Sequence, residues 1–513
     1  MLLIPVLLLI AIFSATWVLI ILYIKRNRAF ARSLTLHPPK VYFLGMDLTM
    51  AVEDEVQRFE SVWRMFLSHD RMFKHLLGPI MGIGISHPDL MHKVLSHPDC
   101  LEKPFFYNFV QLEHGIFSAE YKLWKGQRKA LNPTFNMKIL NSFISIFEDC
   151  SSRMVADLFK CANGETVDMF QFTSKCTLEM VCATTLGSNV LEREGSDEFL
   201  RNMEGLFELV GKRMLSVELF LDSIYRLTSY YRKEMKIRKK IEEFSGNIIR
   251  EKRREHMFCL NQQHLHNAST PKEDEDDIRK PQIFIDQLLS LSNSSRPFTD
   301  EEILHNVLTI MIAGNDTSGL GVAHACLFLA IYPNIQQKVY DEVMKHFPPD
   351  GPNDRISLDA DFLRQLEYTE MFLKEVLRHC PVAPTVARQN LKELELDGVR
   401  IPAGNTLSFS FFALHRRKDI WGPDAEKFDP ENFAPERCEK RHPYAFMPFS
   451  SGSRNCIGGR YAMISMKVMI VYIVRNFSLK TNLRHSHLRY KFGMTLKLPF
   501  AHAIQVYKRN IEQ

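Results

Sequence analysis

The stretch Pro448–Gly459, with the sequence PFSSGSRNCIGG, constrains this chain more than any other, because it places one cysteine among glycines at fixed offsets. Gly452 and Gly458 lack side chains and can adopt positive φ, so the backbone can curl beneath a flat cofactor and direct N–H groups at the sulfur of Cys456. Residues 460–468 then follow a helical pattern, which would put the positive end of a helix beside a thiolate. The stretch therefore predicts a loop that presents one cysteine sulfur to a metal.

Two further side chains of this loop favour a metal site, although a lone cysteine is more often a small buried apolar residue. Phe449 is placed to shield the sulfur, and Arg454 is placed to donate a charge-assisted hydrogen bond to an anionic group of the cofactor. The spacing Phe-x-x-Gly-x-Arg-x-Cys-x-Gly resembles, residue for residue, the haem-thiolate motif of the cytochrome P450 family. The resemblance implies heme b (iron protoporphyrin IX) with Cys456 as its axial ligand and Arg454 at a haem propionate.

Length and composition indicate one large catalytic domain over residues 46–513. The chain has 513 residues, of which 45% are hydrophobic and 11% aromatic, and it shows no internal repeat or long Gly/Ser/Pro linker in this body. Lys and Arg number 65 against 60 Asp and Glu, and the net charge of +5 is spread out, so no nucleic-acid partner is predicted. Ten scattered cysteines without a Cys-x-x-Cys pair argue against a disulfide framework.

The first 24 residues predict a transmembrane anchor. Residues 2–24 are almost continuously apolar and uncharged, a run long enough to span about 30 Å of hydrocarbon as a helix. Positive charges follow in the linker 25–45, which also contains His37-Pro38-Pro39, and they should remain cytosolic. We therefore predict a single-pass membrane protein whose catalytic domain faces the cytosol, and the resemblance implies that the membrane is that of the endoplasmic reticulum (microsome).

Three donors outside the loop resemble the propionate-binding groups of the same family. Trp124 and Arg128 lie four residues apart in a helical stretch, so both can donate to one anion. A packed Trp beside a surface Arg is the alternative for this pair. Arg388, at the end of Pro384–Arg388, resembles a further propionate partner.

A second polar site is predicted inside a long apolar helix. Thr299–Glu302 form a capping box that opens the helix, which continues to about Tyr332. Gly314 lies in its middle, where glycine costs about 1 kcal/mol relative to alanine, and Asp316 and Thr317 follow. In the family this is the oxygen-activation groove, so the resemblance implies Gly314 at the cofactor and Asp316 and Thr317 as an acid–alcohol pair that delivers protons. The alternative is that these polar side chains only bond to their own helix.

A buried ion pair is expected near the end of a helix predicted over residues 362–379. Glu375 and Arg378 share one helix face, and the resemblance implies that they form a folding lock behind the haem with a third residue, an Arg. Asn432 stands at that third position. The charge network is thus incomplete, and we expect Asn432 to bond to the backbone or to Glu375.

Other segments carry coarser predictions. Ile80–Ile85 is predicted as a strand whose Gly82 and Gly84 allow close packing rather than bind a dinucleotide. Residues 143–254 are predicted to be mostly helical, and residues 256–282 to be a flexible polar loop. Phe105, Phe106, Tyr107 and Phe109 are predicted to lie mainly in the core, with the alternative that one or two of them line the substrate pocket. Residues 382–386 and 492–496 are predicted at the pocket edge.

The motifs together imply a mainly α protein with small β-sheets, the helical triangular prism of the cytochrome P450 family, and a monooxygenase reaction. NADPH-cytochrome P450 reductase, with cytochrome b5 as a second partner, would supply electrons, and one atom of O2 would enter a small apolar substrate. Arg441–Phe449 is closest to the fatty-acid omega-hydroxylase branch and its insect relatives. Ala313 replaces the glutamate with which that branch commonly forms a haem ester, so the substrate stays open among fatty acids, hormones, terpenoids and xenobiotics such as insecticides.

Three other classes of protein use or tolerate such a loop. A haem-thiolate isomerase or dehydratase would need no reductase, but such enzymes tend to lack the acid–alcohol pair. An electron carrier would need no substrate pocket. A non-catalytic membrane-anchored haem binder or sensor would consume NADPH without forming product.

Overall fold

The computed structural model describes residues 54–77, 80–187, 193–216, 219–266, 283–291, 297–346, 358–491 and 493–509, together with isolated positions and short pairs elsewhere. Helices dominate these residues, and the strands form small sheets of two, three, four and two strands, as predicted. The predicted anchor and most of the linker lie outside the described residues. In the part of the chain that is described, no single helix is apolar and long enough to cross a membrane. Helices α13 (Asp300–Ile331) and α14 (Pro333–His346), bent by 113° relative to each other, reach that length and apolar composition only as a pair.

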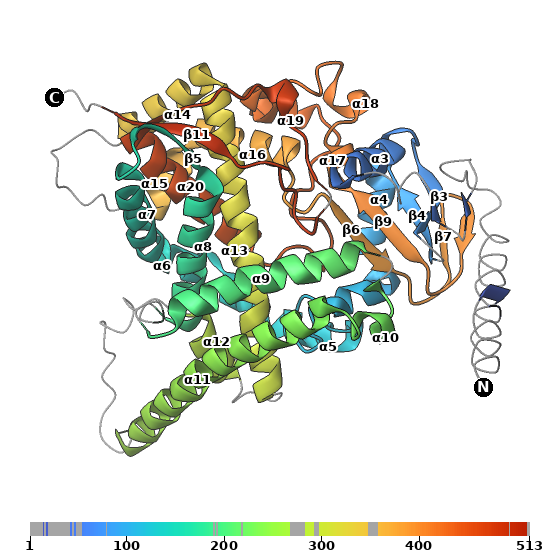
Figure 1. Cartoon of the computed structure of the whole chain (residues 1–513), viewed down its shortest axis with the longest axis horizontal. Coiled ribbons are helices and arrows are strands. Elements are labelled where there is room, and N and C mark those ends of the chain that lie inside the picture. The colour runs from blue at the N-terminus through green and yellow to red at the C-terminus, as the bar shows by residue number, and fades with distance from the viewer. Residues whose placement is uncertain are drawn as a thin grey trace, which may run out of the picture.

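Helix α13 (Asp300–Ile331) runs through the middle of the helical part (Figure 1). It begins at the predicted capping box: Thr299 Oγ1 accepts from the Glu302 N–H at 3.1 Å, and Glu302 Oε2 accepts from the Thr299 N–H at 3.0 Å. Helix α8 (Met169–Leu186) packs along it. A Cβ on Gly314 would lie 2.8 Å from Val181 of α8, so the unfavourable glycine is explained in part by close helix packing.

The largest apolar cluster among the described residues joins α13 to α7 (Ile144–Phe159) and α20 (Gly459–Asn476). Phe147, Phe328 and Val471 are fully buried in it. Helix α20 is the helix predicted after Cys456, and its N-terminus is therefore held rigidly against the core.

Two sheets flank the helices at opposite sides of the molecule (Figure 1). One has the order β3 (Met72–Leu77), β4 (Ile80–Ile85), β9 (Thr406–Ser410), β6 (Thr385–Gln389), with β4 and β9 parallel and the other pairs antiparallel. Helix α3 (Glu55–Leu67) packs on it through Val62 and Phe66. The other sheet has the order β10 (Phe477–Lys480), β11 (Ala503–Lys508), β5 (Asn163–Asp168).

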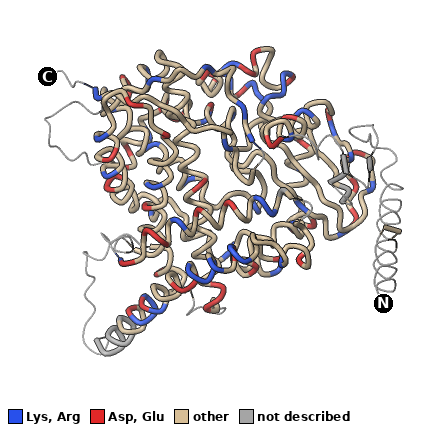
Figure 2. Tube along the Cα trace, in the orientation of Figure 1, with Lys and Arg blue, Asp and Glu red and all other residues tan. Residues whose placement is uncertain are grey.

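Two sequence-based boundaries are wrong, and one strand lies within a segment that is mostly helical as predicted. Strand β5 interrupts the helices predicted over 143–254, because its mostly polar side chains carry no apolar alternation. Helix α11 (Ser229–His266) continues through the first part of the predicted loop, and residues 267–282 lie outside the described residues. Up to Glu255, α11 carries charges of both signs (Figure 2), and its continuation through residues 256–266 contains no glycine or proline that would end the helix. The helix predicted over 362–379 is two helices, α15 (Ala360–Gln365) and α16 (Glu367–His379), which break at Leu366.

Candidate active site

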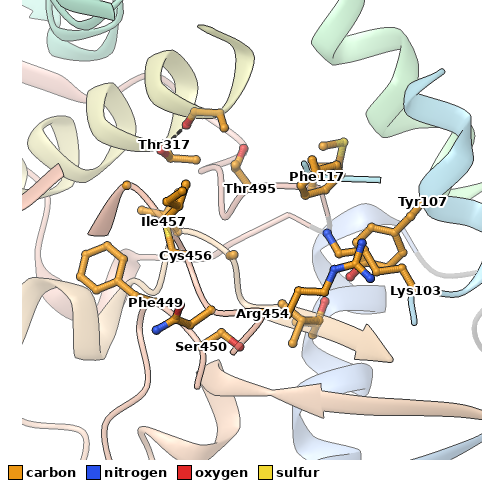
Figure 3. Close-up of a pocket in the computed structure, with 18 of the residues that line it drawn as sticks. Lys103, Tyr107, Phe117, Thr317, Phe449, Ser450, Arg454, Cys456, Ile457 and Thr495 are labelled. Atoms are coloured by element: carbon orange, nitrogen blue, oxygen red, sulfur yellow. Dashed lines mark hydrogen bonds between the residues drawn. The ribbon is translucent and has the colours of Figure 1, made fainter. Parts of the chain in front are cut away.

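The cysteine loop is held in shape by its own backbone. The Cys456 N–H donates to the Phe449 carbonyl at 3.0 Å, and the Asn455 N–H donates to the Gly452 carbonyl at 3.2 Å. Ser450 adopts a φ of +63°, which few residues other than glycine do. The loop thus fixes Phe449 beside Cys456, as Figure 3 shows.

The two loop glycines serve different purposes. Gly452 has a φ of +74°, and a Cβ there would lie 2.0 Å from the Leu95 carbonyl oxygen at the end of α4 (Pro88–Ser96). Gly458 has a φ of −88°, so the expectation of positive φ is wrong for it. A Cβ on Gly458 would meet nothing within 4 Å, which leaves room beside the sulfur.

The Cys456 side chain is exposed to a cavity of about 860 Å³ and surrounded by protein on its other sides. Burial raises the pKa of the Cys456 thiol, while the Gly458 N–H and the Arg128 guanidinium act in the opposite direction. An N–H directed at the sulfur is what the sequence predicted. Among the described residues no cluster of three His, Cys, Asp or Glu side chains could hold a metal.

The wall above the sulfur belongs to α13, where Thr317 lines the cavity (Figure 3). Thr317 Oγ1 donates to the Ala313 carbonyl at 2.5 Å. Thr317 therefore bonds to its own helix, which is the alternative that the sequence left open. That alternative does not describe Asp316, which accepts from Thr495 Oγ1 at 2.7 Å and pairs with Lys497 at 3.0 Å. Asp316 is buried and does not itself line the cavity, but Thr495 does.

The remaining wall is mostly apolar and includes both predicted edges. The residues that the sequence analysis singled out and that line the cavity here are Phe106, Tyr107, Gly314, Val382, Ala383, Thr385, Val386, Met494 and Thr495. Phe105 is 46% exposed instead of lying in the core. Such a surface binds apolar molecules and keeps water away from the sulfur.

Three cations of one cavity wall, Lys103, Arg388 and Arg454, form what we call the cation cluster (Figure 3 labels Lys103 and Arg454). Arg454 donates to the carbonyls of Leu101 and Ala119, and Arg388 Nη2 donates to the Arg454 carbonyl at 3.2 Å. The Nε atoms of Arg388 and Arg454 are buried without a hydrogen-bond partner. The cluster therefore has unused donors.

The cation cluster is short of negative charge. Its nearest carboxylate is Glu102, at 3.9 Å from Arg454 Nη1. Burial and the neighbouring Arg388 lower the pKa of Arg454 to about 9, and burial with both arginines holds the pKa of Lys103 well below its usual range. Unpaired buried cations are costly, so this wall fits an anionic ligand.

Trp124 and Arg128 lie on α5 (Tyr121–Leu131), and both line the cavity as the helical spacing predicts. Arg128 donates to the carbonyl and side-chain oxygens of Asn455, at 2.8 and 2.7 Å. It therefore holds the cysteine loop, and Trp124 lies 4.9 Å from the Arg454 guanidinium. Trp124 and Arg128 thus both lie at the site, but two donors of Arg128 are already bonded to Asn455.

Glu375, Arg378 and Asn432 form a second buried group, here called the Glu375 cluster. Arg378 donates to Glu375 through two bonds of 2.7 and 2.8 Å, and to the carbonyls of His415 and Ala425 at 2.8 and 2.7 Å. Asn432 Nδ2 donates to Glu375 Oε1 at 3.1 Å. The expected bond of Asn432 to Glu375 is thus present, and the cluster does not line the cavity.

The sequence did not predict that Lys103 lies at the site, nor that its ammonium contacts the rings of Phe117 and Tyr107. The Lys103 ammonium lies 3.6 Å from the centre of the Phe117 ring and 4.6 Å from that of Tyr107. Tyr107 Oη accepts from the Ala387 N–H at 3.1 Å, beside Arg388. The only signal in the sequence was an isolated lysine before an aromatic run, which has no motif spacing.

Comparison with known proteins matches residues 37–501 to the Cytochrome P450 family model. The chain is 30% identical over 481 residues to Cytochrome P450 4c21 of Blattella germanica, which covers 93% of this chain and 94% of that protein. It is 31% identical over 424 residues to Probable cytochrome P450 4p2 of Drosophila melanogaster, covering 81% and 79%. It is 28% identical over 449 residues to Cytochrome P450 4V2 of Homo sapiens, covering 87% and 84%.

Proposed function

Because this chain belongs to the cytochrome P450 family and is a monooxygenase of that family, we propose that it inserts one oxygen atom of O2 into a small apolar substrate at the endoplasmic reticulum membrane. The observation that carries this proposal is one cavity with Cys456 on its floor, Thr317 above it and an apolar wall (Figure 3). Its redox partner is a reductase, for which we propose NADPH-cytochrome P450 reductase, with cytochrome b5 as a second donor.

The cofactor of the family is heme b with an axial cysteine thiolate, and the residues present fit it. Cys456 would hold the iron, and the cation cluster would hold the two propionates with its unused Nε donors. When bound, the haem supplies O2 activation, which thiolate donation favours. Gly458 leaves open space beside the sulfur where a side chain would obstruct a flat ring.

Residues of α13 and of the C-terminal segment would carry protons to the cavity. Thr317 presents its hydroxyl to the cavity, and Asp316 is connected to the cavity through the Thr495 hydroxyl. Lys497 pairs with Asp316 at 3.0 Å. We propose that Asp316 takes up a proton from solvent and passes it by way of Thr495 or water to Thr317, while the apolar wall excludes bulk water from the rest of the cavity.

We propose the same four substrate classes that the sequence indicated. Fatty acids, hormones, terpenoids and xenobiotics such as insecticides are all apolar molecules that the apolar part of the cavity wall, outside the haem-binding residues, would accept. The printed names of the relatives state no substrate.

Thr317→Ala tests the function through the amount of product formed per NADPH consumed, with purified reductase and any substrate that turns over. We expect this ratio to fall about 10-fold or more, because a positioned proton donor is lost. Ser318→Ala, one residue along α13, is the matched control and should leave the ratio near that of the unchanged protein. Unchanged coupling in Thr317→Ala would remove this residue from the mechanism, and product formed without NADPH would contradict the monooxygenase assignment.

A further inference from the structure

The lining of the cavity includes residues of helix α3 and of the four-stranded sheet, and we call the space that they border the arm. The residues that line this arm come from both elements: Ser61, Val62, Arg64, Met65, Phe66 and Ser68 from α3 and its end, and His75, Gly82, Thr406 and Ser408 from the sheet. None of them belongs to the cysteine loop, α13 or the cation cluster. The arm therefore offers a place for a part of the substrate remote from the sulfur.

The sheet face under α3 is shaped to hold one histidine. His75 of β3 lies opposite Gly82 of β4, and a Cβ on Gly82 would be 2.4 Å from the His75 ring. Phe73 lies in the same way over Gly84. A strand glycine weakens a sheet, so these two glycines are explained by the rings that lie across them. The prediction of close-packed strand glycines is confirmed, and its result is a fixed position for His75.

The fixed histidine is paired with a hydroxyl from a distant part of the chain. A ring nitrogen of His75, Nε2, lies 2.7 Å from Ser408 Oγ on β9. Ser408 Oγ can also donate to the Ile83 carbonyl, at 3.3 Å. Burial lowers the pKa of His75 to about 4, so the ring is neutral near pH 7. The pair offers neutral hydrogen-bonding groups at the wall of an otherwise largely apolar cavity.

The arm contains little that would neutralise an anion. Among the described residues that line it, Arg64 is the one cation, and its side chain is 65% exposed and lies 3.5 Å from Glu60. The buried cations Lys103, Arg388 and Arg454 belong to the cation cluster, which our proposed function assigns to the propionates. A carboxylate in the arm would lose its hydration without gaining a buried counter-charge.

We propose that the arm is a subsite for the far end of an elongated apolar substrate, and that His75 and Ser408 recognise a neutral hydrogen-bonding group there, such as a hydroxyl or an ester oxygen. This inference rests on the proposed function, because it names a substrate class for the same cavity. It favours long-chain alcohols, esters and related neutral molecules over free acids.

The test is the haem absorbance change on ligand binding, measured on the haem-loaded full chain with four probes: dodecane, 1-dodecanol, methyl dodecanoate and dodecanoic acid. We expect 1-dodecanol to bind about 5-fold more tightly than dodecane, the value of one net hydrogen bond, and more tightly than dodecanoic acid. Ser408→Ala should abolish the preference for the alcohol and leave dodecane unchanged, and His75→Leu should do the same. Thr385→Val, which removes a hydroxyl from β6 in the same cavity, is the control that keeps the preference.

Two results would overturn the inference. Tighter binding of dodecanoic acid than of 1-dodecanol, lost in Arg64→Gln, would make the arm a carboxylate site. Equal weakening of dodecane and 1-dodecanol in Ser408→Ala would make the polar pair a packing feature only. The proposed function fails separately: an intact alcohol preference without any NADPH-dependent product would contradict the function, whereas product without an alcohol preference would contradict the subsite.

Discussion

The cation cluster and the Glu375 cluster both bury arginines, yet they differ in how these arginines are satisfied. In the Glu375 cluster, the Arg378 side chain has no exposed surface and its donors reach Glu375 and three backbone carbonyls. In the cation cluster, Arg388 and Arg454 are buried to nearly the same degree, but their Nε atoms have no partner and Glu102 is 3.9 Å away.

The difference separates a structural site from a ligand site. Buried charges with complete partners stabilise a fold only as a unit, and removing one partner leaves an uncompensated charge. Buried charges with unused donors are stabilised when an anion arrives. Substitutions in the two clusters should therefore act on different measurements, the first on folding and the second on cofactor retention.

The largest effect is expected from Arg378→Ala. It leaves Glu375 buried without its bidentate partner, so the free energy of unfolding should fall by about 3–5 kcal/mol. The measurement is urea unfolding followed by far-UV circular dichroism. Arg437→Ala is the matched control, because Arg437 pairs with Asp429 at 2.9 Å but is 53% exposed, and its loss should change stability by less than about 1 kcal/mol. Equal effects of the two substitutions would show that the Glu375 cluster is not a folding lock.

Arg454→Met should affect haem retention more than folding. The unfolding curve should change less than in Arg378→Ala, because the loss of the hydrogen bonds to the Leu101 and Ala119 carbonyls is offset by the removal of a buried cation that has no full counter-charge. Haem should dissociate about 10- to 100-fold faster, as one charge-assisted hydrogen bond to a propionate is lost. Transfer of haem to an excess of a haem-binding acceptor protein measures this rate. Unchanged haem release together with a collapsed fold would place Arg454 among the structural charges.

The smallest effect is expected from Asn432→Ala. Glu375 keeps the two bonds from Arg378 and the Asp429 N–H at 2.8 Å, so the loss of one donor should cost about 1–2 kcal/mol in unfolding free energy. Asn432→Asp, of the same size, would place a second carboxylate beside Glu375 and should cost more. If both variants unfold like the unchanged protein, Asn432 does not take part in the cluster.

The motifs could be found from the sequence because their spacing is local. The loop around Cys456, the capping box at Thr299 and the pair Glu375 and Arg378 each depend on neighbours within a few residues, and each is present. The contacts of Asp316 could not be found, because Thr495 and Lys497 lie about 180 residues away and only the fold brings them together. Lys103 was missed for the same reason, since its role depends on Arg388 and Arg454 from other segments.

The ends of the helices were harder to predict from the sequence than the residues of the candidate site. The break at Leu366 leaves the helical pattern on either side intact. Helix α11 continues into the polar stretch 256–266, which contains no glycine or proline that would end it. Gly314 was attributed to the cofactor alone, whereas the approach of Val181 also requires it. Packing between distant helices leaves no mark in the sequence of either one.

The most direct test of the account is the carbon-monoxide difference spectrum of the reduced protein in Cys456→Ala and Cys438→Ala. Among the described cysteines these are the two that are exposed, so Cys438 is a matched control. We predict that Cys456→Ala abolishes the strongly red-shifted band that a thiolate ligand produces, and that Cys438→Ala keeps it. A red-shifted band that survives in Cys456→Ala would show that another residue binds the iron and would contradict the account.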